Sequence, residues 1–514
     1  MTADLLAPLD LAFWSIDSAD HPMHLGALGV FSAHSPTAGA HAADLLAARA
    51  AAVPGLCMRI RDVWRPLDLR LPLAHGPRRP LNFGGAAREP DPCFDPLNHV
   101  RLHAPATDFH AAAGRLMQRP LERNRPPWEA HVLPGEDGVS FAVLFKFHHA
   151  LADGLRALTL AAAILDPIDR PEPRPRPAEP SSGLLHDVRR LPGLLRGALS
   201  DVGRALDIGA RVARSTLVTR STPALTAGPT GTRRTAGVVV DIDDVHLVRK
   251  AVGGTVNDVL IAVVAGALRG WLEERGETVR GIAPRALIPV SRRRPRTAHP
   301  QGNRLSGYLM ELPIGVPDPL RRLAAVRTAM DRNKDAGPDR GAGAVALLAD
   351  YVPALGHRLG GPLVGQAARL WFDILVTSVP LPGFGLKLGG HPLTEVYPFA
   401  PLARGQSLAV AISTYQGHVH YGLVADARAV PDLNRLAGAI REEVETLITV
   451  CGPTAPSSGS SAPGLARPGS GMKPTENSGF MGELRCVEQV VDREDDVQAR
   501  HGEDPADARI GDDQ

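Results

Sequence analysis

The chain has 514 residues, more than one hydrophobic core usually accommodates, so two structured domains are expected. Because 57 Lys and Arg nearly balance 55 Asp and Glu, the formal net charge is only +2, which argues against a general nucleic-acid binder. The four cysteines lie far apart without CxxC spacing, which is typical of reduced thiols in a cytosolic protein.

The hydropathy of the sequence predicts neither a secretion signal nor a membrane-crossing helix. The first residues show neither the basic region nor the sustained apolar region of a secretion signal. The longest apolar run, Val259–Leu268, is well short of the roughly 18 residues that a transmembrane helix needs. We therefore expect a cytoplasmic protein that contacts the inner membrane face or lipid inclusions only peripherally.

Residues 1–165 mix short apolar strands with helical stretches and are expected to form the first domain. Here an apolar strand, Phe141–Phe147, runs into His148 and His149, and Asp153 and Gly154 follow. A strand that ends in a tight turn holds an imidazole in a fixed position, and neutral imidazole accepts a proton near neutral pH. The segment therefore predicts a histidine that acts as a general base.

Alternation along this strand decides between the two histidines. His149 shares a face with the aromatic residues of the strand, whereas His148 points the other way with Lys146. The base at the strand's end, facing a channel between the domains, is therefore His149. Asp153 is expected to fix the turn, for example through an arginine, and Gly154 to allow close packing or a positive φ where the next helix begins.

Two other interpretations of the histidines compete with this one. Metal binding by His148, His149 and Asp153 is disfavoured, because adjacent strand residues diverge and no HExxH or cysteine partner is present. A purely structural histidine pair stays open as an alternative. A separate pair, His418 and His420, shares one face of a later strand without a third ligand and is expected to be exposed.

After residue 165 the composition changes twice. Residues 166–232 are expected to form a crossover in which a proline-rich linker, Asp166–Ser182, precedes a basic amphipathic helix, Leu184–Arg214. That helix either lies on an anionic membrane surface or packs on the protein with its arginines solvated. Residues 233–450 are expected to form a second α/β domain, and residues 451–514 a disordered tail without chemistry. The elements expected in the second domain are strands at Val238–Ile242 and Pro284–Val290 and helices at Asn257–Leu272 and Leu433–Val450.

Several segments together resemble one protein family. The HHxxxDG segment, His148–Gly154, resembles the active-site motif of CoA-dependent acyltransferases with the chloramphenicol acetyltransferase-like fold, which include peptide-synthetase condensation domains. Pro120–Glu129 resembles the PLxxxxPxW element of the bacterial wax ester synthase/diacylglycerol acyltransferase family. Further segments similar to that family are Pro8–Phe13, Pro22–Gly26, Thr255–Leu260, Gly302–Ser306, Tyr397–Leu402 and Gly422–Asp426. The resemblance thus extends over most of the chain between residues 6 and 450.

The resemblance implies an α/β (α+β) fold of two chloramphenicol acetyltransferase-like domains, each a mixed sheet flanked by helices, with an active-site tunnel between them. It implies transfer of a fatty acyl group from acyl-CoA, the co-substrate, to the hydroxyl of diacylglycerol or of a long-chain alcohol, without a metal or a tightly bound cofactor. His149 is then the general base for the hydroxyl proton, with His148 supporting it and Asp153 orienting it.

Other candidate site residues lie in the second domain. Asn257 is a candidate donor to the oxyanion or to the channel wall, and equally a candidate N-cap for a helix that begins at Asp258. Arg292 and Arg293 are candidates for binding the CoA phosphates, with a solvated loop as the alternative.

The chain departs from the family pattern at two places. Thr377–Pro382 stands where the family has an NVPGP-like turn, with Ser378 and Leu381 in place of Asn and Gly, and Ala409 stands where an Asn is common. These positions are expected to shape the second domain's face of the channel. Two rival functions therefore stay open: a non-catalytic lipid-binding relative and a condensation-type enzyme that forms amides.

Overall fold

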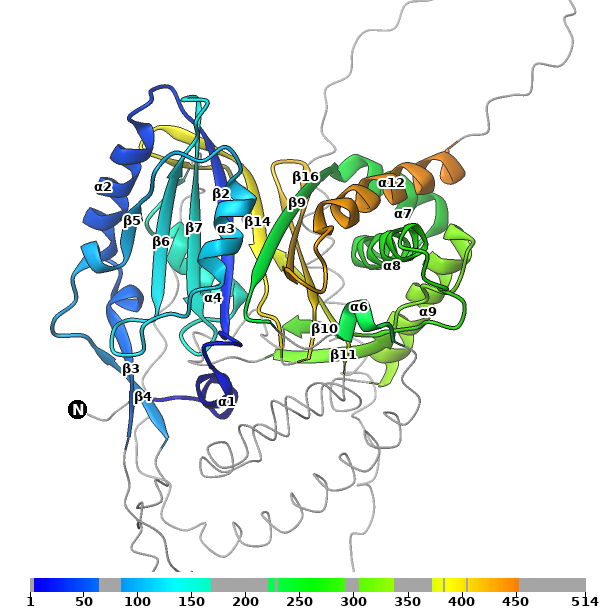
Figure 1. Cartoon of the computed structure of the whole chain (residues 1–514), viewed down its shortest axis with the longest axis horizontal. Helices are drawn as coiled ribbons and strands as arrows, with labels where there is room; N and C mark the ends of the chain where they lie inside the picture. Colours follow the sequence, from blue (N-terminus) through cyan, green and yellow to red (C-terminus); the bar gives the residue numbers. More distant parts are fainter. Residues whose placement is uncertain are drawn as a thin grey trace, which may run out of the picture. The chain divides into compact units, whose positions relative to one another are not determined.

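The computed structural model shows three β-sheets among the described residues, and they lie with their helices within one unit, Met1–Pro453 (Figure 1). The expected linker after Pro167, the expected basic helix, Arg292, Arg293 and the tail after residue 452 lie outside the described residues. The structure describes residues 4–63, 85–167, 221–226, 230–291, 305–336, 372–381, 384–403 and 405–452.

Within the described residues, the first sheet has seven strands in the order β5-β6-β7-β2-β14-β13-β8. Strand β7 pairs antiparallel with β2 and β6, so His148 lies opposite His24 and Phe147 lies opposite Trp128. The strands are β2 (His24–Ser32), β5 (Val100–Leu102), β6 (Trp128–Pro134), β7 (Ser140–His148), β8 (Asp166–Pro167), β13 (Leu386–Leu388) and β14 (His391–Phe399).

The two faces of β7 bury different cores, as the expected alternation requires. Phe141, Val143, Phe145 and Phe147 belong to a core with residues from three helices, α1 (Pro8–Ile16), α2 (Ala38–Ala50) and α4 (Gly154–Ala162). Ala142 and Leu144 belong to a second core with α3 (Phe109–Met117) and strands of the other sheet. A strand buried on both faces is an almost continuous apolar run, which is the sequence pattern seen here.

A small antiparallel sheet stands beside α1. It has the order β1-β4-β3, and the strands are β1 (Asp4–Leu5), β3 (Met58–Asp62) and β4 (Ala86–Pro90). Figure 1 shows α1, β3 and β4 at the lower end of the first sheet. Arg88 of β4 is opposite Asp4 in β1 and Ile60 in β3. This register sends a cationic side chain into the interior, where Arg88 is buried.

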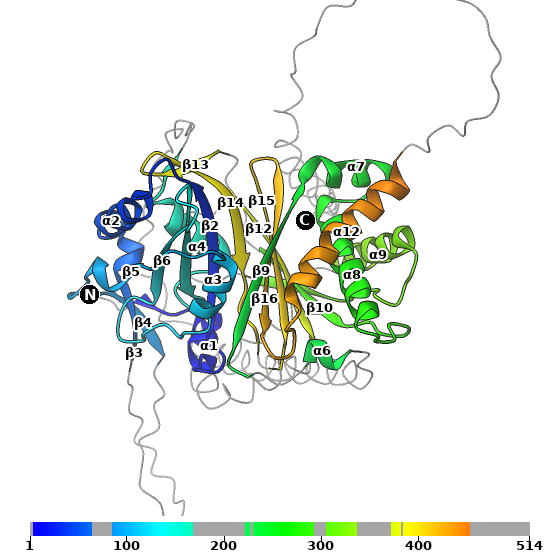
Figure 2. The same cartoon turned by 45° about the horizontal axis from the view of Figure 1, so that its top comes forward.

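The second sheet has six described strands in the order β11-β10-β12-β15-β16-β9, and helices cover one of its faces (Figure 2). Its elements confirm the four expected ones: three agree to within two residues at each boundary, and β9 begins five residues before the expected strand. The strands are β9 (Arg233–Asp241), β10 (Arg285–Ser291), β11 (Leu305–Glu311), β12 (Ile374–Pro380), β15 (Leu408–Tyr415) and β16 (His418–Asp426). The helices are α6 (Pro223–Thr226), α7 (Ile242–Val252), α8 (Val256–Glu274), α9 (Pro319–Ala336) and α12 (Leu433–Cys451).

Two strands cross from the second half of the sequence to the first sheet. β13 and β14 fall inside the expected second domain, 233–450, yet β14 pairs antiparallel with β2. A division at residues 165 and 233 therefore does not assign every strand to its sheet. Tyr397 and Phe399 explain the crossing, because they fill a core shared by Leu28 of β2 and Ala411 of β15.

We call the contact of β14 with β15 and β16 the seam. Gly422 of β16 lets the backbones approach closely there, since a Cβ at Gly422 would overlap the carbonyl oxygen of Pro398. Strand β9 also contacts α3: the hydroxyl of Thr235 in β9 donates to the carbonyl of His110 in α3 at 2.7 Å. The two sheets are thus joined by strand packing and by hydrogen bonding.

Among the described helices, none meets the length and hydropathy of a membrane-crossing helix by itself. α7 and α8 meet that criterion only as a pair, with a bend of 101° at the break between them. Most residues of α8 are buried in the core of the second sheet.

Candidate active site

The HHxxxDG segment forms the turn between β7 and α4. β7 ends at His148 and α4 begins at Gly154. Two main-chain hydrogen bonds fix the start of the turn: His148 N donates to Pro127 O at 2.9 Å, and His149 N donates to Met23 O at 2.8 Å. The Pro-Pro-Trp segment and the residue before β2 therefore position the histidines.

The end of the turn is fixed by the helix that follows it. Asp153 is the N-cap of α4, and its carboxylate accepts the amide of Arg156 at 2.8 Å. Of the two alternatives for Gly154, a positive φ is wrong. A Cβ at Gly154 would lie 3.4 Å from Val379 of β12, an ordinary van der Waals distance, so the packing there does not itself require glycine.

His149 is half-buried, and its ring stacks on Phe13 of α1 with 4.0 Å between the centroids and 23° between the planes. Burial lowers the pKa of His149 from the usual 6.5 to about 4. A hydrogen bond with its own backbone and the charge of Asp153 oppose this shift, and His148 adds to it. At pH 7 roughly one ring in a thousand is then protonated.

Burial keeps the His149 ring neutral near pH 7, because it lowers the pKa. A neutral imidazole has the form that a general base requires.

His148 is buried and bonds the turn that follows it. Its Nδ1 accepts the amide of Ala150 at 3.0 Å, and its Nε2 lies 3.6 Å from Oδ1 of Asp17. The edge of Trp14 meets the ring with 4.9 Å between centroids. With 2% exposure, His148 has contacts that fit a supporting role.

Sequence reasoning missed two residues of this site, Arg88 and Asp10. Nη2 of Arg88 donates to the carbonyl of Ala150 at 2.7 Å and to Oδ2 of Asp10 at 2.6 Å. The arginine was expected as a partner of Asp153, whereas Arg88 pairs with Asp10, and no local pattern indicated Arg88 or Asp10. The separations of 62 and 78 residues explain why.

A buried charged network lies on the His148 face of the sheet. Lys146 is fully buried, and its Nζ donates to the carbonyl of Arg119 at 2.8 Å and to Oε2 of Glu129 at 3.2 Å. Although burial opposes it, the hydrogen bond from His131 and the charge of Lys146 lower the pKa of Glu129 to about 2. Burial, with the charge of Lys146, holds the pKa of His24 well below its usual value. The charge of Lys146 is thus compensated beside the histidine pair.

Two family models match this chain. The wax ester synthase/diacylglycerol acyltransferase catalytic domain matches residues 6–260, and the C-terminal domain of the same family matches residues 301–448. The chain belongs to the wax ester synthase/diacylglycerol acyltransferase family. A probable diacylglycerol O-acyltransferase from Mycobacterium tuberculosis is 31% identical over 474 residues, which cover 86% of this chain and 98% of the relative.

Solved structures agree on the fold. The wax ester synthase/diacylglycerol acyltransferase from Marinobacter aquaeolei VT8 superposes with a TM-score of 0.62 at 22% identity, covering 88% of this chain and 100% of that one. The trichothecene 15-O-acetyltransferase TRI3 from Fusarium sporotrichioides superposes with a TM-score of 0.55 at 11% identity, covering 86% and 94%. The expected α/β fold of two chloramphenicol acetyltransferase-like domains is confirmed.

The family's ND element lies in the first turn of α8. Thr255 caps this helix and Asp258 completes a capping box: Asp258 N donates to Oγ1 of Thr255 at 3.2 Å, and Thr255 N donates to Oδ2 of Asp258 at 2.8 Å. The N-cap alternative for Asn257 was therefore wrong, because the helix begins one residue before it. Asn257 is half-buried, and its contact with reacting atoms stays a prediction.

The segment that departs from the family's NVPGP-like turn faces the start of α4. Val379, within Thr377–Pro382, is the β12 residue nearest Gly154. Ser378 is exposed, and Leu381 packs against the core of the first sheet. Ala409 is buried at the seam, where it fills a shared apolar core. A small apolar residue therefore suits this position.

The expectation that His418 and His420 form an exposed pair was wrong. His418 is exposed, but His420 is 1% exposed and its ring meets Tyr397 across the seam at 5.7 Å between centroids. Burial lowers the pKa of His420 to about 4. Neither of its ring nitrogens has a hydrogen-bond partner among the described residues. Strand position predicted the shared face, whereas burial followed from packing against β14.

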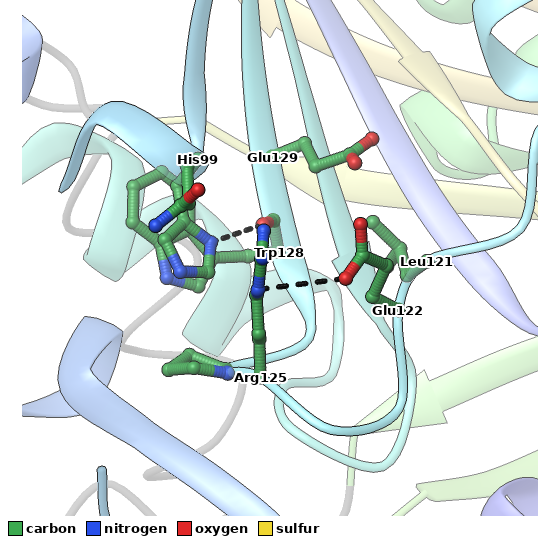
Figure 3. A pocket seen from close by; sticks show the side chains of 8 residues that line it. His99, Leu121, Glu122, Arg125, Trp128 and Glu129 are labelled. Carbon is green, nitrogen blue, oxygen red and sulfur yellow. Dashed lines mark hydrogen bonds and ion pairs between the residues drawn. The ribbon is translucent and has the colours of Figure 1, made fainter. Parts of the chain in front are cut away.

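Figure 3 shows a small pocket at the entry of β6, lined in part by residues of the PLxxxxPxW element. Arg125 pairs with Glu122 at 3.4 Å on one side, and His99 Nδ1 bonds the carbonyl of Trp128 at 2.9 Å on the other. The HHxxxDG histidines do not line it. In the part of the chain that the structure describes, no group of three metal-ligating side chains converges.

Proposed function

We infer that this protein is an acyl-CoA-dependent O-acyltransferase. It transfers a fatty acyl group to the hydroxyl of diacylglycerol, giving triacylglycerol, or of a long-chain alcohol, giving a wax ester. Family membership over both halves of the chain supports this activity. The observation that carries it is the position of His149 directly after β7, where its amide is held by the carbonyl of Met23 and burial keeps its ring neutral.

The proposed reaction needs one base. Nε2 of His149 takes the proton of the acceptor hydroxyl as its oxygen attacks the thioester carbonyl. The resulting tetrahedral intermediate carries an oxyanion, and its collapse breaks the carbon–sulfur bond and forms the ester. The imidazolium then gives its proton to the CoA thiolate, which restores His149, and no covalent acyl-enzyme is formed.

Other groups have narrower roles in this proposal. Asn257 donates a hydrogen bond to the oxyanion or to the channel wall, and Arg292 and Arg293 bind the phosphates of acyl-CoA. No tightly bound cofactor, metal or nucleic acid takes part. Because both substrates are lipids, the proposal includes peripheral contact with a membrane or lipid inclusion. It places the enzyme in the cytoplasm. In this proposal a tunnel between the sheets holds the acyl chain.

The test compares two histidine variants of the full chain with palmitoyl-CoA as donor. His149→Ala is expected to lower thiol release with hexadecanol or diacylglycerol by at least about 100-fold, the usual contribution of a general base. His418→Ala, an exposed histidine on β16, serves as the matched control and keeps its turnover. Near-normal turnover of a folded His149→Ala protein would refute the proposed role.

The same assay separates the rival functions. Retention of acyl-CoA without thiol release in the presence of either acceptor would indicate a lipid-binding relative. Faster thiol release with hexadecylamine than with hexadecanol would indicate a condensation-type enzyme that forms amides. Thin-layer chromatography of the products assigns the acceptor.

A further inference from the structure

A buried ion pair is hydrogen-bonded to the residue that follows the proposed base. Nη2 of Arg88 and Oδ2 of Asp10 are 2.6 Å apart, and their side chains are 3% and 0% exposed. The same Nη2 donates to the carbonyl of Ala150 at 2.7 Å. One guanidinium nitrogen therefore joins α1, the small sheet and the residue that follows His149.

This bond completes the fixation of the main chain around His149. The amide of His149 is held by the carbonyl of Met23, the amide of Ala150 by Nδ1 of His148, and the carbonyl of Ala150 by Arg88. Bonds on both sides of a residue restrict its φ and ψ, and these angles set the direction in which its side chain leaves the backbone.

The same ion pair also fixes the ring that stacks on His149. Asp10 and Phe13 are three positions apart in α1, so they lie on neighbouring positions of one helix face. α1 has nine residues and no side-chain hydrogen bond at its N-cap, and helices this short are marginal by themselves. Its position therefore depends on tertiary contacts, of which the bond between Asp10 and Arg88 is a buried, charged one.

We propose that Arg88 and Asp10 are positioning residues for the base: the pair orients His149 through the carbonyl of Ala150 and through Phe13 of α1. This inference rests on the proposed role of His149. If the pair only stabilised the fold, the bond between Arg88 and Asp10 would be sufficient for that role. The bond to Ala150 and the helical link to Phe13 both lead to the same imidazole.

The test uses a double variant that leaves no unpaired buried charge, Arg88→Gln/Asp10→Asn. Gln is too short to replace the guanidinium at Ala150, so the carbonyl loses its donor while the fold is spared an isolated charge. We expect a melting temperature near that of the wild type and a kcat about 10- to 100-fold lower, with the KM for palmitoyl-CoA within about twofold. The acid limb of the pH profile shifts toward 6.5 as His149 loses its packing.

Arg59→Gln is the matched control. Arg59 pairs with Glu89 at 2.6 Å across β3 and β4 of the same small sheet, with about a third of each side chain exposed, and is expected to leave kcat unchanged. Wild-type kcat and pH profile in the folded double variant would overturn the proposal. If the double variant does not fold, Phe13→Leu decides: a lowered kcat with a shifted acid limb supports the proposal, and wild-type behaviour overturns it.

The parallel His149→Ala measurement separates the two hypotheses. An active His149→Ala protein refutes the base itself. An inactive His149→Ala protein beside a fully active, folded double variant refutes only the positioning role.

Discussion

The pH dependence of turnover tests the electrostatics of His149 directly. A base works only in its neutral form, so activity is present above the pKa of the free enzyme's base and is lost as the pH falls through it. With the pKa of His149 lowered to about 4 by burial, about 90% of the rings stay neutral at pH 5. An unshifted histidine of pKa 6.5 would be only about 3% neutral at pH 5 and about 76% neutral at pH 7.

These fractions give two clearly different outcomes. The structure predicts that kcat/KM at pH 5 is within about 10% of its value at pH 7, whereas an unshifted histidine predicts a fall of about 25-fold. Thiol release is measured with 4,4′-dithiodipyridine, which reports thiols at acid pH. Near-ultraviolet circular dichroism at each pH shows that the protein is folded. Glu129, with a pKa of about 2, stays ionised at pH 5.

A midpoint near pH 6.5 in folded protein would refute the reasoning. It would mean that the His149 ring is solvated in the working enzyme and that its stacking on Phe13 does not persist in solution.

Two further predictions concern the seam. Unfolded histidine is protonated near pH 6.5 but buried His420 only near 4, so stability is lost as the pH falls between these values, by about 2 kcal/mol from pH 7.5 to pH 5. His420→Phe is expected to remove this pH-dependent loss of the free energy of unfolding, which urea unfolding at pH 7.5 and pH 5 measures. An unchanged pH dependence in the variant would contradict the assignment. His418→Phe, at an exposed histidine, is the control. Gly422→Ala is expected to destabilise the fold by about 1–3 kcal/mol or more because its Cβ meets the Pro398 carbonyl. Gly270→Ala in α8, where a Cβ meets nothing within 4 Å, is expected to be neutral or stabilising, and equal effects of the two glycine variants would contradict the close approach.

The seam explains two of the segments that resemble the family. Tyr397–Leu402 includes the end of β14, and Gly422–Asp426 is the end of β16. They meet where Gly422 passes the carbonyl of Pro398. Their common role in this structure is to bring the two sheets together.

Short-range patterns determined much of this protein. The apolar run before His148 predicted the strand that the structure shows as β7, and alternation along it matches the two cores that its faces bury. Apolar spacing predicted α8 and α12 to within a few residues. These features depend on residues a few positions apart, whose relation is set by the geometry of a single strand or helix.

Tertiary structure alone decided the rest. The bond between Arg88 and Asp10 joins residues 78 positions apart, and β14 leaves the second half of the chain to pair with β2. The burial of His420 follows from that crossing, because β14 covers its side of β16. Contacts of this kind depend on how sheets and helices meet in space, and the amino acids on either side of each residue carry no record of its distant partner.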